Sequence, residues 1–103
     1  MKVALLYFDD CPNWRQTLKD VNAVLKEYHV DAEVELIKVT SRQEAQRLAF
    51  LGSPTVRIDG ADVEPDVPDS GYGMECRVYW VEERAEGAPP KEWIAATVEA
   101  ALE

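Results

Sequence analysis

Residues 7–14, with the sequence YFDDCPNW, mark the point at which a strand is expected to end and a helix to begin. Residues 3–8 form a continuous apolar, β-branched and aromatic run, which is typical of a strand buried on both faces. Pro12 fits the first position of a helix, because proline has no N–H to leave unpaired there and its φ is already helical. Apolar residues then recur at alternating spacings of four and three, which predicts one face of a helix over residues 12–29: Trp14, Leu18, Val21, Leu25 and Tyr28.

This helix start suggests a chemical role for Cys11. Free N–H groups and the positive end of the helix dipole favour an anion at this place. We therefore predict that Cys11 is a nucleophilic thiolate, stabilised by the N–H groups of Asn13 and Trp14. Asp9 and Asp10 oppose ionisation of the thiol if either carboxylate lies close to the sulfur. The alternative is an inert cysteine packed under Trp14.

Length and charge limit the possible functions. A chain of 103 residues is expected to form one domain, residues 1–103. Its formal net charge of −9, from 11 basic and 20 acidic residues, argues against nucleic acid or an anionic membrane surface as a partner. A secretory signal and a membrane-spanning stretch are both missing from the sequence, which favours a cytoplasmic location. Two cysteines without a C-x-x-C spacing favour a free or redox-active thiol over a structural disulfide or a metal site, and no cofactor is expected.

The rest of the chain predicts two strands and a helix, then an acidic loop, a further strand and a last helix. Ser41 and Glu44 form a capping box at the start of the second helix, and Gly52 is its expected end. Alternation places Cys76 and Arg77 on opposite faces of the fourth strand. The predicted ranges are strand 33–39, helix 41–51, strand 55–59, exposed loop 62–73, strand 76–81 and helix 90–102.

The order of these elements and two short motifs resemble the thioredoxin-like superfamily over nearly the whole chain. Residues 8–14 resemble the active-site turn of that family, and residues 52–55, Gly-Ser-Pro-Thr, resemble the cis-proline loop that faces the turn. Residues 52–60 and 76–79 also resemble small bacterial thioredoxin-family proteins that are sometimes labelled alkylmercury lyase. The resemblance implies an α/β fold of order β-α-β-α-β-β-α, with a four-stranded mixed sheet and helices on both faces. It also implies a cis bond before Pro54 and a substrate-binding surface made by Pro12, Asn13, Trp14, Ser53, Pro54 and Thr55.

The sequence departs from the family at the second cysteine of its C-x-x-C motif, where Trp14 stands instead. Cys11 is therefore expected to act as a single thiol. Cys76 is the one other cysteine that could resolve a disulfide at Cys11. A strand that starts at the far end of the sheet would place it about 15 Å away, too far for a disulfide. Only a fold-back of residues 62–73 could bring the two together; otherwise Cys76 is a buried strand cysteine.

We therefore expect a thiol–disulfide oxidoreductase, or a thiol-dependent reductase, that acts through Cys11 on a protein or small-molecule thiol or disulfide. The alternative is a binding module without turnover. In that case the Pro54 groove and Trp14 would hold a peptide, a partner protein or a soft metal ion such as mercury.

Overall fold

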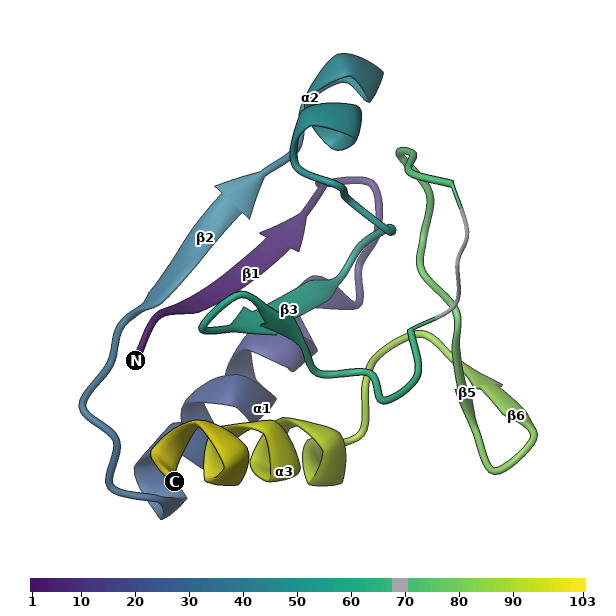
Figure 1. Ribbon diagram of the computed structural model, residues 1–103. Helices are drawn as coiled ribbons and strands as arrows, with labels where there is room; N and C mark the ends of the chain where they lie inside the picture. Colours follow the sequence, from purple (N-terminus) through teal and green to yellow (C-terminus); the bar gives the residue numbers. More distant parts are fainter. Residues whose placement is uncertain (68–70) are drawn as a thin grey trace.

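The computed structural model describes residues 1–67 and 71–103 and has an α/β architecture (Figure 1). Its main sheet is mixed and four-stranded, in the order β2-β1-β3-β4, and a separate hairpin pairs β5 with β6. The strands are β1 Val3–Tyr7, β2 Val34–Lys38, β3 Thr55–Ile58, β4 Ala61–Asp62, β5 Tyr79–Val81 and β6 Arg84–Glu86. The helices are α1 Trp14–Glu27, α2 Arg42–Arg47 and α3 Lys91–Leu102.

Strand β1 lies at the centre of the main sheet and has an apolar layer on each side. It runs parallel to β2 and antiparallel to β3, and β3 runs antiparallel to β4. Val3 and Leu5 pack with α1, β3 and α3 on one face. Leu6 packs with Ala45 of α2 and with Phe50 on the other face. The predicted α/β class, with a four-stranded mixed sheet and helices on both faces, is thus confirmed.

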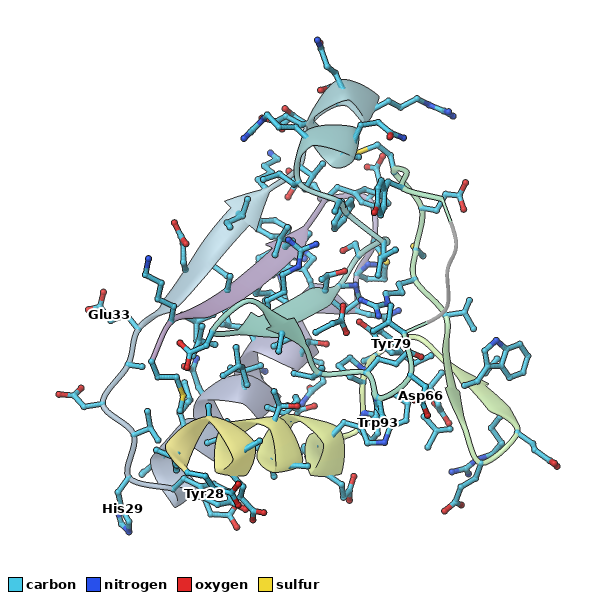
Figure 2. All side chains as sticks on the ribbon, viewed as in Figure 1. Tyr28, His29, Glu33, Asp66, Tyr79 and Trp93 are labelled. Atoms are coloured by element: carbon cyan, nitrogen blue, oxygen red, sulfur yellow. The ribbon has the colours of Figure 1, made fainter. Side chains whose placement is uncertain are left out.

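Helices α1 and α3 lie side by side below the sheet in Figure 1, and their contact extends to the end of α1. There the hydroxyl of Tyr28 donates a hydrogen bond to the Glu99 carboxylate. At the other end of α3, Trp93 meets the ring of Tyr79 edge to face, with ring centroids 6.2 Å apart (Figure 2). The start of α3 is therefore tied to the strand that carries Tyr79.

The predicted element order is wrong after β3. Asp59 and Gly60 both have positive φ, 51° and 85°, which suits the two-residue turn of a tight hairpin. This turn leads directly into β4, so Ala61–Asp62 takes the position beside β3 that was predicted for residues 76–81. Residues 79–81 pair with β6 instead. An Asp-Gly dipeptide is a hairpin signal, but the sequence prediction ended the strand at residue 59 and placed no hairpin there.

The start of α1 and the end of α2 also differ from prediction, whereas the start of α2 does not. Helix α1 begins at Trp14 with Asn13 as its N-cap, so Pro12 and Cys11 both precede the helix. Helix α2 begins as predicted, because the Ser41 hydroxyl accepts from the Glu44 N–H at 3.1 Å.

The end of α2 at Arg47 has a different cause from the predicted glycine stop. Ala49, at φ 53°, takes the left-handed position. Its N–H donates to the Gln46 carbonyl at 3.2 Å, and the Phe50 N–H donates to the Ala45 carbonyl at 2.8 Å. These two bonds form a Schellman motif that ends the helix before Gly52 and buries Phe50 completely.

None of the helices in the described part of the chain combines the length and the apolar character needed to cross a membrane.

Candidate thiol site

Cys11 lies in the turn between β1 and α1 and is completely buried. Its N–H donates to the Phe8 carbonyl at 3.3 Å, and its Sγ donates to the Ser53 carbonyl at 3.4 Å. The Phe8 N–H donates in turn to the Ser53 hydroxyl at 3.3 Å. The Ser53–Pro54 bond is cis, as predicted, and this loop lies directly against the cysteine turn. The Cys11 sulfur therefore donates to the Ser53 carbonyl. The prediction was that it would accept from the N–H groups of Asn13 and Trp14.

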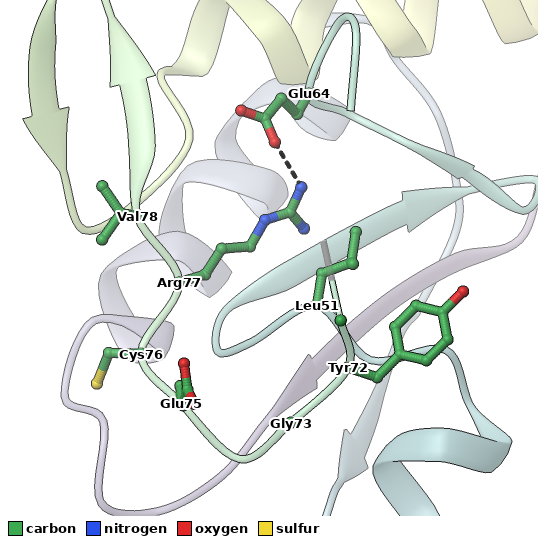
Figure 3. A pocket seen from close by; sticks show the side chains of 9 residues that line it. Leu51, Glu64, Tyr72, Gly73, Glu75, Cys76, Arg77 and Val78 are labelled. Carbon is green, nitrogen blue, oxygen red and sulfur yellow. Dashed lines mark hydrogen bonds and ion pairs between the residues drawn. The ribbon is translucent and has the colours of Figure 1, made fainter. Parts of the chain in front are cut away.

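Cys76 lies on the other side of Ser53. The Ser53 N–H donates to the Glu75 carbonyl and the Arg77 N–H donates to the Ser53 carbonyl, both at 2.9 Å, which makes a single parallel bridge between Ser53 and Cys76. The Cys76 side chain points toward the loop that joins β1 and α1 (Figure 3). Hydrogen bonding to Cys11 raises the pKa of Cys76 to about 11, and desolvation and the negative charge of Asp10 add to the shift. The two cysteines therefore lie against the same residue, Ser53, and both are free.

The predicted separation of about 15 Å between the two cysteines is wrong. That value assumed that residues 76–81 start at the far end of the sheet and pair beside β3. The hairpin at residues 59–60 gives the place beside β3 to β4, and the chain then returns to the cysteine turn before it reaches Cys76. Cys76 lies back at the cysteine turn, as the fold-back that the sequence left open requires, and residues 68–70 of that loop lie outside the described part of the chain. Cys76 is also exposed, whereas a buried strand cysteine was the expected alternative.

Residues 75–77, which we call the docked segment, approach Gly52 very closely. Gly52 has φ 121°, a value that favours glycine. A Cβ at this position would lie 2.8 Å from the Glu75 carbonyl oxygen and 3.0 Å from the Arg77 Cβ. Glycine is therefore required at residue 52 for the docked segment to lie against Ser53.

A buried ion-pair network anchors the docked segment, and Figure 3 shows its Arg77–Glu64 pair. Arg77 Nη1 lies 2.8 Å from Asp62 Oδ2, and Arg77 Nη2 lies 2.8 Å from Glu64 Oε1. The exposed fractions of these side chains are only 5% for Arg77, 12% for Asp62 and 8% for Glu64. The guanidinium also donates to the Thr55 hydroxyl at 3.1 Å and lies 4.4 Å from the centre of the Tyr79 ring. The prediction that the acidic loop is exposed is wrong for Asp62 and Glu64.

Sequence reasoning did not assign a role to Arg77, Asp62, Glu64 or Tyr79. The usable signal was the alternation over residues 76–81, which placed Arg77 and Tyr79 on one face. The structure buries that face and exposes Cys76, Val78 and Trp80 on the other. A buried arginine requires acidic partners, and the acidic residues just after β3 supply them.

Of the three predicted binding residues that follow Cys11, only Pro12 is exposed to solvent. Trp14 is half-buried and stacks on Tyr7, with ring centroids 4.1 Å apart. Asn13 lies against Gly87, where an added Cβ would come within 2.3 Å of the Asn13 amide nitrogen.

On the facing loop, Ser53, Pro54 and Thr55 are all buried. The Thr55 hydroxyl donates to the Gly52 carbonyl at 2.6 Å, and the Pro54 carbonyl accepts from the Tyr79 hydroxyl. The chain itself therefore occupies most of the surface that was predicted to bind substrate.

A cavity of about 420 Å³ borders the docked segment, with Leu51, Glu64 and Tyr72 among its lining residues. The Arg77 side chain points toward this cavity and the Cys76 sulfur points away from it (Figure 3). Cys76 is thus one of the lining residues, but its sulfur is directed toward the cysteine turn. Among the residues that the structure describes, no group of three or more His, Cys, Asp or Glu side chains could hold a metal ion.

No protein-family model matches this chain, and comparisons with curated proteins and with solved structures give no significant match. Functional inference therefore depends on the site itself. Its chemistry is that of two adjacent thiols, one buried and one exposed, joined through the backbone of one serine.

Proposed function

We propose that this protein is a thioredoxin-like thiol–disulfide oxidoreductase in which Cys11 and Cys76 form the redox pair. The observation that carries the proposal is the position of the two cysteines on either side of Ser53, where Cys11 Sγ donates to the Ser53 carbonyl and Cys76 forms a backbone bridge with Ser53, with both cysteines free. The position of Cys11 between the first strand and first helix, opposite a loop with proline, also supports a thioredoxin-like arrangement. Cys76 takes the place of the second cysteine that the sequence lacks at Trp14.

The reaction is reversible thiol–disulfide exchange. The two cysteine thiols lose two protons and two electrons as the Cys11–Cys76 disulfide forms. A substrate disulfide accepts the two electrons and the two protons and is released as two thiols. Two equivalents of an external thiol then reduce the protein disulfide again and are oxidised together to one disulfide.

A redox titration tests this proposal. The protein is equilibrated in dithiothreitol buffers of graded potential, and the remaining free thiols are counted by alkylation and mass spectrometry. We expect the wild type to lose two thiols together as one internal disulfide, and Cys11→Ser or Cys76→Ser to form none. Disulfide reductase turnover should also be lost in both variants. Full turnover in Cys76→Ser would show instead that Cys11 acts alone, as the sequence suggested.

The same pair of sulfurs supports a second candidate, a binding site for a soft metal ion such as mercury. Two adjacent thiolates match the preference of such ions for sulfur ligands. In that case one equivalent of mercuric ion should bind the wild type and protect both thiols from alkylation, and each single serine variant should bind far more weakly. A wild type that binds the ion but forms no internal disulfide and shows no turnover would favour this candidate. Peptide binding along Ser53 is less well supported, because the docked segment uses its backbone.

A further inference from the structure

Access to the two sulfurs is unequal. Cys11 is completely buried, between the cysteine turn and the loop that holds Ser53. Cys76 is exposed and belongs to the outward-facing side of its segment, together with Val78 and Trp80. An external molecule can therefore reach Cys76 from solvent, whereas Cys11 is reached only through its contact with Cys76 or after the docked segment leaves.

Several contacts hold the docked segment in place and so keep Cys11 shielded from solvent. Its backbone pairs with Ser53 on both sides of Cys76, and the Arg77 guanidinium joins it to Asp62 and Glu64 in a buried network. Gly52 permits this approach, because any side chain there would collide with the Glu75 carbonyl. Release of the segment would break these contacts together and would leave the Arg77 charge without its partners.

The docked segment also excludes one class of substrate. An extended polypeptide that adds to a backbone edge needs a free N–H and a free carbonyl to pair with. Ser53 has neither to offer, because its N–H donates to Glu75 and its carbonyl accepts from Arg77, each at 2.9 Å. A polypeptide substrate therefore cannot pair its backbone with Ser53 to position itself at the two cysteines.

The electrostatic surroundings of Cys76 distinguish among small molecules. Each cysteine has an exposed acidic neighbour in the chain, Asp10 beside Cys11 and Glu75 beside Cys76. The formal net charge of the chain is −9. Anionic thiols and disulfides are therefore repelled, and cationic ones are attracted.

We infer that Cys76, rather than Cys11, exchanges with the external partner, and that this partner is a small thiol or disulfide without net negative charge. The inference depends on the redox pair proposed above. In the oxidised protein, an external thiolate RS⁻ attacks the Cys76 sulfur and the Cys11–Cys76 bond breaks. Cys11 leaves as a thiolate and takes a proton, and a Cys76–S–S–R mixed disulfide remains.

The cycle then closes with a second external thiol. Its thiolate attacks the sulfur of R in the mixed disulfide, which releases RSSR and the Cys76 thiolate, and that thiolate takes a proton. Two external thiols have lost two electrons and the protein disulfide has gained them. Starting from RSSR and the reduced protein, the same steps run in reverse.

Trapping experiments with cystamine, a small dicationic disulfide, test which cysteine exchanges. Reduced wild type is mixed with substoichiometric cystamine, quenched with acid and mapped by mass spectrometry. We expect the first adduct on Cys76. With single cysteines, Cys11→Ser should form the adduct at least about tenfold faster than Cys76→Ser, because its remaining sulfur is exposed. Val78→Thr, on the same exposed face, is a matched control that should react like the wild type.

These measurements separate the failure of this inference from that of the proposed function. An internal disulfide that forms through a first adduct on Cys11 would overturn the inference and leave the redox pair intact. An adduct on Cys76 that never resolves to the internal disulfide would overturn the redox pair and leave Cys76 as the exchanging cysteine.

The substrate class is tested with two comparisons on the wild type. The first partner is a ten-residue peptide whose cysteine is disulfide-linked to cysteamine and whose net charge equals that of cystamine. We expect the peptide to react no faster than cystamine, and a peptide that reacts ten times faster would refute exclusion of polypeptides. The second partner is the anionic glutathione disulfide. It should react more slowly than cystamine, and the difference should shrink as salt is added. Equal rates at low salt would refute the charge preference.

Discussion

Replacement of Arg77 by methionine is the change expected to disturb this site most. The guanidinium lies 2.8 Å from both Asp62 and Glu64, and none of the three side chains is more than 12% exposed. Solvent therefore screens the ion pairs weakly, and removal of the arginine leaves two buried carboxylates without a positive charge beside them. Loss of one partner from a buried ion pair costs about 3–5 kcal/mol of the free energy of unfolding. This is a large part of the roughly 5–15 kcal/mol that stabilises a typical domain.

The assay is urea unfolding followed by tryptophan fluorescence at pH 7. A loss of this size should lower the urea midpoint by about 2 M for a chain of this length. Formation of the Cys11–Cys76 disulfide should be slower in the variant, since Arg77 holds the docked segment in place.

Two further variants show whether the stranded charges are the cause. Arg84→Met removes an exposed arginine that lies 3.9 Å from Glu86, and it should change stability by less than about 0.5 kcal/mol. The triple variant Arg77→Met, Asp62→Asn, Glu64→Gln leaves no stranded charge and should recover much of the loss. If Arg77→Met destabilises the protein no more than Arg84→Met does, the network does not anchor the docked segment.

Three other changes give independent checks. Gly52→Ala should lower the free energy of unfolding in urea by roughly 2–4 kcal/mol, because it combines a positive φ with a clash against Glu75. Gly60→Ala, with nothing within 4 Å of its Cβ, should lower it by only about 1 kcal/mol. Equal losses would argue against the close approach of the docked segment to Gly52. Ser41→Ala removes the N-cap of α2 and should cost about 1 kcal/mol in the same assay, and no loss would mean that the cap is dispensable. Because the pKa of Cys76 is raised, the folded protein keeps the thiol proton to higher pH than the unfolded chain does. The contribution of this thiol to stability is therefore complete below about pH 9 and is lost as the pH rises toward about 11. Cys76→Ser should lack this decline in stability between pH 9 and pH 11.

Several features of the fold could be predicted because they depend on neighbours along the chain. The Ser41 cap requires only two side chains at a fixed spacing, and the structure contains its first half, in which the Glu44 N–H donates to the Ser41 hydroxyl. The Glu44 carboxylate accepts from the Thr40 N–H in place of the Ser41 N–H. The apolar face of α1 follows from a hydropathy period of 3.6 residues, and the burial of β1 follows from a continuous apolar run. The alternation that separates Cys76 from Arg77 is also local, and it is confirmed by their opposite exposure.

The candidate site was only half predictable. The turn at Cys11 and the cis bond before Pro54 were predicted from short motifs that resemble a known superfamily, and the structure has both. The second thiol was placed wrongly, because its position depends on which strand lies beside β3. The Asp59-Gly60 turn decides that question within four residues, and its hairpin signal was read only as a strand end.

The sequence by itself determined the α/β class, the central β1, the cap of α2 and the importance of the turn at Cys11, since each depends on local propensity or on hydropathy pattern. The tertiary structure alone decided that Cys76 meets Cys11, that Arg77 is buried with Asp62 and Glu64, and that Ser53 is occupied by its own chain. The physical reason is that these contacts join residues far apart in the sequence. A long-range contact forms only where the packing of the whole chain repays the entropy of closing the loop, and no short pattern records that balance.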